Sequence, residues 1–529
     1  MDPAALPVDP SAGWLSQAVL MWMFGVTIGG WYLLTRRYAG QKLRSSSFAI
    51  SLREREEQPA LVIILIAASV CGLVVYAAAL TGDEASNLEP NFWTNWYLAW
   101  ESRSSPPLFR FLIHGLALIA EERVLMRLPS LACGLASLWY LYILLRRRTS
   151  APNAHWMLGM VASSALFVGY ATQQKAYTPW LLLLLMVHRC FASAMRGRRT
   201  MWARFSVLAT LSVLTHYLSV GWLLGYAFWV WQFSRRDVRD VALALLPAAL
   251  AVLPMLWPIL AVNEPVSEGP GVRLLGDWLR DSMSAAFVPG GLIATILLFV
   301  PRPMEHVRGT HHGDGALSWA ILGGLIAAFG ASVGGSLHAR FLMPVVPFAA
   351  LALAGRMPRP TRDWSRNDRA MLVLAALGSL AIGTARIGPM LVAPSMNPVR
   401  TALVELEDEP PPSLRLVFPP WALHGALFEA SGRRDLLHKP MPDGALRLSA
   451  KVDGATWGVL RGKPDTKTFD ALVKKHQTVE IWALAGGDGN TDLPPINAWT
   501  RGVCHDAVDI GEIRPALPGP WVRVWRCGR

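Results

Sequence analysis

Residues 125–148 read LMRLPSLACGLASLWYLYILLRRR, an apolar run that ends in three consecutive arginines. A helix needs roughly 20 mostly apolar residues to cross the hydrocarbon core of a bilayer. Lys and Arg concentrate in the short cytoplasmic loops of membrane proteins. The stretch therefore predicts a transmembrane helix over 125–145 whose Arg146 end faces the cytoplasm.

Similar runs recur on both sides of this helix. Hydrophobic residues make up 53% of the 529-residue chain and charged residues only 16%, whereas soluble domains carry about 25% charged residues. We therefore predict a polytopic α-helical membrane protein, in which the spans as counted place no ionisable residue near the bilayer midplane. The twelve predicted spans are 14–35, 61–80, 125–145, 155–171, 178–194, 202–215, 218–233, 241–261, 285–300, 317–333, 341–355 and 370–388.

The loops between these spans alternate in charge. One set of alternate loops is rich in arginine and the other is poor, so the rich set is predicted to be cytoplasmic and both termini extracytoplasmic. The rich set includes Arg36, Arg37, Arg146, Arg147, Arg148, Arg196, Arg198, Arg199, Arg235, Arg236, Arg239, Arg302, Arg308, Arg356, Arg359 and Arg362. Residues 1–13 contain no Lys or Arg, so the first span is predicted to be an anchor rather than a signal peptide.

The net charge of +13 is therefore explained by the arginines of the predicted cytoplasmic loops. The tail lacks a stripe of basic and aromatic residues, so no nucleic-acid partner is expected.

The first outer loop of the main helical region, 81–124, carries two adjacent carboxylates, Asp83 and Glu84. Charges beside lipid are costly unless they are solvated or used, so they mark either a solvated helix end or a site. Residues 108–120 have apolar residues at helical spacing, which suits an amphipathic helix on the outer leaflet.

Further polar groups lie at the outer ends of other spans: Lys175, Tyr177, His216, Tyr217, His338 and Arg340. Together, a carboxylate, an imidazole and two cations would suit a phosphate-bearing substrate and a hydroxyl to be activated. Taken singly, His216 could simply bond a neighbouring helix and Lys175 could snorkel to the interface.

The order of these motifs resembles the GT-C membrane glycosyltransferases, and in particular bacterial relatives of protein O-mannosyltransferases and the lipid A aminoarabinose transferase. The resemblance covers roughly residues 60–390 and rests on motifs that are individually unspecific. They are Asp83-Glu84, Ser-Pro-Pro-Leu-Phe at 105–109, Arg-Leu-Pro-Ser at 127–130, Lys-Ala-Tyr at 175–177, Thr-His-Tyr at 215–217 and His-Ala-Arg-Phe at 338–341.

The resemblance implies transfer of a sugar from a polyprenyl-phosphate donor to a lipid, glycan or protein acceptor, outside the bacterial inner membrane. It implies that Asp83 acts as the base, with Glu84 beside it. Lys175 and Arg340 would hold the lipid phosphate, and His216 would line the site or bind metal. A single base would favour one displacement with inversion at the sugar.

The sequence departs from the family pattern in three ways, one of which is that the 172–177 turn has no acidic residue where some branches carry an Asp. Lys175 stands where many relatives have Arg, which removes bidentate phosphate binding. The first loop has no Asp-x-Asp, and Glu84 with His216 is a thin ligand set for a hard divalent cation. No cofactor is therefore assigned, and a divalent metal stays an open alternative.

The polar tail, 391–529, is predicted to be a small extracytoplasmic α/β domain, which follows a catalytic module at 61–390 and an extra helix with a basic loop at 1–60. Strands are predicted at 414–418, 456–460, 479–483 and 521–525, and helices near 398–407, 421–431 and 469–476. Cys504 and Cys527 would lie in an oxidising compartment, so they are predicted either to form a disulfide or to stay as two thiols.

Two other classes of function remain open. A transporter or lipid flippase usually has midplane charges or internal repeats, and Pro254 and Pro258 could break one helix. An inactive accessory protein with a GT-C fold would be expected to lose the Asp83-Glu84 pair.

Overall fold

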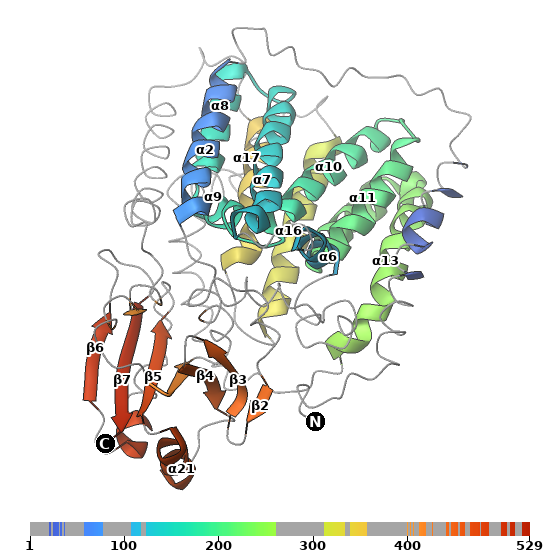
Figure 1. Cartoon of the computed structure of the whole chain (residues 1–529). Coiled ribbons are helices and arrows are strands. Elements are labelled where there is room, and N and C mark those ends of the chain that lie inside the picture. The colour runs from blue at the N-terminus through green and yellow to red at the C-terminus, as the bar shows by residue number, and fades with distance from the viewer. Residues whose placement is uncertain are drawn as a thin grey trace. The chain divides into compact units, whose positions relative to one another are not determined.

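A computed structural model gives the fold of the chain (Figure 1). The chain forms two compact units, and each is described separately: residues 1–72, 93–112 and 127–385, and residues 73–92, 113–126 and 386–529. The structure describes residues 21–22, 25–30, 32–33, 36, 58–77, 107–117, 123–260, 312–333, 339–356, 399, 402–403, 406, 412–418, 426, 441–443, 446–452, 455–460, 466–476, 478–485, 499–504, 508–513 and 521–528.

Helices account for the described part of the apolar region. They are α2 (Gln58–Ala77), α6 (Pro107–Ala117), α7 (Arg123–Arg146), α8 (Ala151–Ala162), α9 (Ala165–Ala171), α10 (Tyr177–Met195), α11 (Met201–Thr215), α12 (Ser219–Phe233), α13 (Val238–Leu260), α16 (His312–Val333) and α17 (Val345–Arg356), with short 3₁₀ turns η3 (Arg235–Asp237) and η5 (Ala339–Leu342).

The helix positions confirm most of the predicted helical segments that fall on described residues. Within this part of the chain, the helices Leu125–Arg146 and Tyr177–Met195 are long and apolar enough to cross a membrane. The single span predicted at 155–171 is wrong, because the helix breaks at Ser163 and Ser164 and the Ser164 hydroxyl accepts a bond from the Phe167 amide. The spans predicted at 285–300 and 370–388 lie outside the described residues.

Glycines let α12 and α16 pack with their backbones in contact. A Cβ added to Gly225 would overlap the carbonyl oxygen of Trp319, and one added to Gly323 would overlap that of Gly221. Small residues four apart allow helices to approach this closely. In Figure 1, α10, α11 and α13 run beside one another in the same helical unit.

The tail contains a seven-stranded sheet in the order β2-β3-β4-β1-β5-β7-β6 (Figure 1). The central strand β1 is parallel to β4 and β5, and the remaining pairs are antiparallel. The strands are β1 (Leu414–Phe418), β2 (Met441–Asp443), β3 (Leu446–Val452), β4 (Ala455–Leu460), β5 (Thr478–Ala485), β6 (Val508–Ile513) and β7 (Trp521–Gly528), and one helix is α21 (Thr466–His476). The four predicted strands and the 469–476 helix are confirmed.

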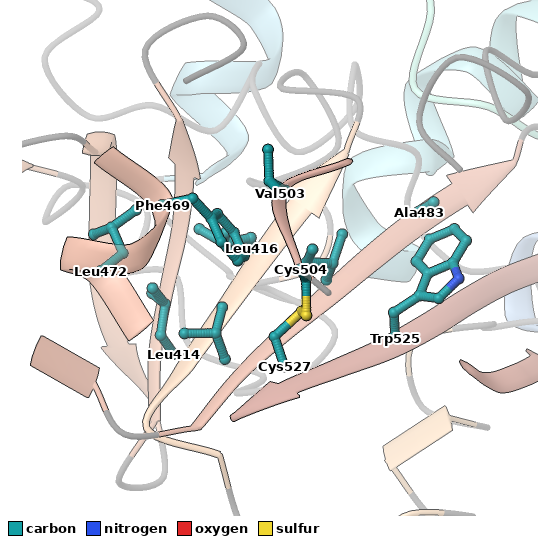
Figure 2. Packing of buried hydrophobic residues seen from close by; sticks show 11 residues of the cluster. Leu414, Leu416, Phe469, Leu472, Ala483, Val503, Cys504, Trp525 and Cys527 are labelled. Atoms are coloured by element: carbon teal, nitrogen blue, oxygen red, sulfur yellow. A yellow bond between two sulfur atoms is a disulfide. The ribbon is translucent and has the colours of Figure 1, made fainter. Parts of the chain in front are cut away.

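One face of the sheet packs against α21 and the 499–504 segment. Figure 2 shows Phe469 and Leu472 of α21 beside Leu414 and Leu416 of β1. The structure also joins Cys504 to Cys527 in a disulfide, with a Cα–Cα distance of 6.0 Å. This bond links the 499–504 segment directly to β7.

The opposite face carries a buried charged row. The strand register places Trp457, Arg415, Glu480 and Arg526 side by side across β4, β1, β5 and β7. The fully buried Glu480 carboxylate accepts bonds from Arg415 (3.1 Å) and Arg526 (2.6 Å), and a third from the Trp482 indole (2.9 Å). Several donors therefore compensate the cost of burying this charge.

Candidate functional site

The helices α10, α11 and α12 carry different chemistry at their two ends. Lys175 lies just before α10, Tyr177 is the first residue of α10, and His216 lies between α11 and α12. The opposite ends of these helices meet the arginine-rich segments 196–199 and 235–239. We call the first group, together with Phe341, the His216 end, and the second the arginine-rich end.

Hydrogen bonds fix the turn that carries Lys175. The Ser130 hydroxyl donates to the carbonyl oxygen of Lys175 at 2.9 Å, and the Thr178 hydroxyl donates to the carbonyl oxygen of Ser130 at 2.6 Å. Ser130 and Thr178 are fully buried. The Arg-Leu-Pro-Ser and Lys-Ala-Tyr motifs, 45 residues apart, therefore hold each other in place.

Aromatic rings surround His216. Its imidazole stacks on the indole of Trp180, with centroids 4.2 Å apart and planes 17° apart. The Tyr177 ring lies 5.3 Å from it, and the Phe341 ring meets it edge-on at 6.1 Å. Two segments far from His216 in sequence, 177–180 and Phe341, therefore converge on its imidazole.

Polar contacts set the orientation of the His216 ring. The Leu218 amide donates to His216 Nδ1 at 3.3 Å, so the neutral ring carries its proton on Nε2. The supporting Trp180 indole donates to the Ser219 hydroxyl at 2.7 Å, which in turn donates to the Ser212 carbonyl oxygen at 2.7 Å. The ring is thus preorganised to donate from Nε2.

The remaining predicted site residues have different outcomes. Tyr217 is half-buried beside His216. The backbone of Arg340 lies in η5, one residue before Phe341. Asp83, Glu84 and His338 lie outside the described residues. Within the described ranges, no three His, Cys, Asp or Glu side chains are grouped so that they could hold a metal ion.

A buried network that the sequence did not indicate lies farther along α10. His188 Nδ1 lies 2.9 Å from the Tyr226 hydroxyl, and its Nε2 lies 3.0 Å from the guanidinium of Arg148. His188 is 1% exposed and is the twelfth residue of this 19-residue helix. The expectation that no ionisable residue lies near the middle of a span is therefore wrong for α10.

The arginine-rich end concentrates positive charge. Burial, followed by the charge of Arg189, lowers the pKa of the Arg147 guanidinium. Burial, followed by the charge of Arg198, likewise lowers the pKa of Arg196. This crowding of cations makes the two ends electrostatically unlike.

Comparisons with known proteins bear on this region. The family model of dolichyl-phosphate-mannose-protein mannosyltransferase matches residues 104–261, less than a third of the chain. Among curated proteins, no sequence matches the chain.

Solved structures with similar folds include ArnT from Cupriavidus metallidurans bound to undecaprenyl phosphate, at a TM-score of 0.49 and 12% identity, over 88% of this chain and 98% of that one. An oligosaccharyltransferase from Archaeoglobus fulgidus, tethered with an acceptor peptide, gives 0.42 and 13%, over 86% and 72%. The arabinofuranosyltransferase AftD from Mycobacteria gives 0.38 and 15%, over 91% and 40%.

The matched segment 104–261 contains the Arg-Leu-Pro-Ser, Lys-Ala-Tyr and Thr-His-Tyr motifs. The structure brings these motifs together around His216. The resemblance to the protein O-mannosyltransferase relatives among the GT-C membrane glycosyltransferases is therefore confirmed over residues 104–261.

Proposed function

We propose that the protein is a membrane glycosyltransferase that moves a sugar from a polyprenyl-phosphate donor to an acceptor on the outer side of a bacterial inner membrane. The observation that carries this proposal is the convergence of Lys175, Tyr177, His216 and Phe341 at one end of the helices. The family match covers Lys175, Tyr177 and His216, and it supports the assignment to a glycosyltransferase.

The proposed chemistry follows from the residue types. Asp83 removes the proton from the acceptor hydroxyl as that oxygen attacks the sugar C1. The bond from C1 to the lipid phosphate breaks, and Lys175 with Arg340 stabilises the negative charge that leaves on the phosphate. One displacement at C1 inverts its configuration.

His216 takes a different role in this proposal. Its Nε2 proton is directed by the Leu218 contact on the other side of the ring, so it is suited to donate to a substrate oxygen. The neighbouring Tyr177 and Trp180 rings are buried against the imidazole and hold it in place.

The test incubates the purified protein with a panel of polyprenyl-phosphate sugars and a membrane extract as acceptor source, and measures release of the sugar-free carrier. Lys175→Met should slow release about 100-fold, the usual loss when one charge-stabilising group is removed from an active site. Lys175→Arg should retain most activity because the positive charge remains. Asp83→Asn should lose about 100-fold or more.

The matched control is Lys451→Met, which removes the same charge from an exposed position on β3. It should leave carrier release unchanged. Equal release from wild type and Lys175→Met would remove Lys175 from the phosphate site. If the wild type releases no carrier with any donor but moves the donor across a vesicle membrane, the flippase alternative is favoured. If the wild type shows neither activity, an inactive accessory protein is favoured.

A further inference from the structure

A groove with apolar walls lies between α12 and α13. Its α12 wall contains Leu224, Ala227, Phe228 and Trp231, and the α13 wall contains Val238, Val241, Ala242 and Leu245. On each helix these positions follow the i, i+3, i+4, i+7 spacing of one helical face. The short η3 turn joins the helices, so two matched apolar stripes face one hollow.

The hollow has a volume of about 390 Å³. Its walls are accessible, since Leu224 is 60% exposed, Phe228 42% and Trp231 50%. Every lining side chain is apolar apart from the indole nitrogen of Trp231. The hollow therefore suits a hydrocarbon chain and gives a sugar or phosphate no partners within it.

Cations lie at the η3 end of the groove. The Arg235 guanidinium lies 5.2 Å above the Trp231 ring, a wall of the groove. Arg239 follows the lining residue Val238 and is exposed. Arg236 forms an exposed ion pair with Asp237, whose carboxylate also accepts a bond from the Ser234 hydroxyl.

The charge balance leaves this mouth positive. Residues 235–240 contain three arginines and two aspartates, and the second aspartate, Asp240, is only partly exposed. No ion pair of Arg235 or Arg239 occurs within the described part of the chain. A phosphate headgroup at the interface would meet these cations at the point where its hydrocarbon chain enters the groove.

We propose that this groove binds one acyl chain of an anionic phospholipid, whose phosphate contacts Arg235 and Arg239. Interfacial arginines recognise anionic headgroups, and the apolar stripes supply the contact for the chain. Because the site recognises both the phosphate and the hydrocarbon chain, it differs from a surface that any lipid can cover. The inference requires that the helices lie in a bilayer, but it is independent of sugar transfer.

The test is native mass spectrometry of the detergent-purified full-length protein titrated with palmitoyl-oleoyl phosphatidylglycerol, or with the matching phosphatidylcholine. The wild type should retain one phosphatidylglycerol in preference to phosphatidylcholine. Arg235→Gln with Arg239→Gln should weaken phosphatidylglycerol binding by about 25-fold, taking about fivefold for each interfacial arginine. Arg198→Gln with Arg199→Gln, a matched pair on the α10–α11 loop, should change it little.

A second pair of variants tests the apolar walls. Ala242→Phe fills the groove and should abolish the retained lipid. Leu246→Phe adds a comparable ring at an exposed α13 position outside the lining and should not. Lipid-free thermal unfolding of each variant shows whether it folds.

Three results would overturn the proposal: equal retention of the two lipids by the wild type, undiminished phosphatidylglycerol binding in Ala242→Phe, or a wild-type dimer that Ala242→Phe converts to monomer. The last result would assign the groove to a second copy of the chain.

Discussion

Glu480 illustrates how a buried charge is stabilised in the tail. Its carboxylate is fully buried and accepts bonds from two arginines and an indole. The Arg415 guanidinium in addition lies 5.1 Å from the Trp457 ring. Removing the carboxylate would leave two cations close together with their shared anion gone.

Glu480→Ala is therefore expected to lower the free energy of unfolding of the tail by about 3–5 kcal/mol, the cost of breaking a buried ion pair from one side. The matched control is Asp509→Ala, which removes the carboxylate of a part-exposed pair with Arg523 in the same sheet. It should cost about 1 kcal/mol or less. Urea denaturation followed by tryptophan fluorescence compares them, and equal losses would contradict this account.

His188 is a second buried polar group, and it lies in the helical unit. Its imidazole contacts the Tyr226 hydroxyl and the Arg148 guanidinium. His188→Ala should lower the free energy of unfolding by about 1–3 kcal/mol, since hydrogen bonds between membrane helices contribute about 0.6 kcal/mol each and an emptied site adds a cavity. Thermal unfolding in detergent measures this loss, and His188→Gln, which keeps a polar side chain, should lose less.

Residue-scale prediction from sequence succeeded where groups occur at helix ends and failed inside helices. Lys175, Tyr177 and His216 were predictable as neighbours because each lies where a predicted span ends on the same side. His188 was not, because its partner Arg148 lies 40 residues away beyond the end of α7. A span count records how apolar a segment is, but not which polar side chains its neighbours supply.

At the scale of elements, the contact between α12 and α16 depends on glycine. Gly225→Ala should destabilise the helical unit by about 1–3 kcal/mol, because the added methyl group overlaps the backbone at Trp319 and forces the helices apart. Gly159→Ala in α8 is the matched control, since nothing lies within 4 Å of its added Cβ. That change should be neutral or stabilising by up to about 1 kcal/mol.

Thermal unfolding of both alanine variants in the same detergent decides this prediction. A lower Tm for Gly225→Ala and an equal or higher Tm for Gly159→Ala are expected. Equal shifts in both would mean that loss of glycine flexibility, rather than the backbone contact, controls stability.

Element positions were predictable to the extent that hydrophobic period and length determine them. The central strands β1, β4, β5 and β7 follow apolar runs, so they were found. The strands β2, β3 and β6 at or near the sheet edges were missed, because edge strands need fewer apolar residues. The break between α8 and α9 was missed because Ser163 and Ser164 satisfy the helix ends locally within an otherwise apolar run.

At the scale of the whole molecule, two independent features predict the same orientation in a membrane, which stays a prediction. Arginines gather at one end of the helices, which predicts a cytoplasmic location for residues 196–199 and 235–239. The tail contains the Cys504–Cys527 disulfide, and disulfides persist in extracytoplasmic compartments. The two features agree only if the chain crosses the membrane an odd number of times between residue 239 and the tail.

Cysteine labelling tests this agreement. Arg199→Cys places a thiol in the exposed α10–α11 loop, and Lys451→Cys places one at an exposed position on β3. In intact bacterial cells, a membrane-impermeant maleimide should label the β3 thiol at once and the loop thiol only after the inner membrane is permeabilised. The wild-type tail should also resist alkylation at residues 504 and 527 until it is reduced, while buried Cys71 and Cys190 stay unlabelled in the folded protein. Labelling of both introduced thiols from the same side would contradict the predicted orientation. It would also contradict the outward-facing donor site, because the His216 end and the arginine-rich end lie at opposite ends of the same helices.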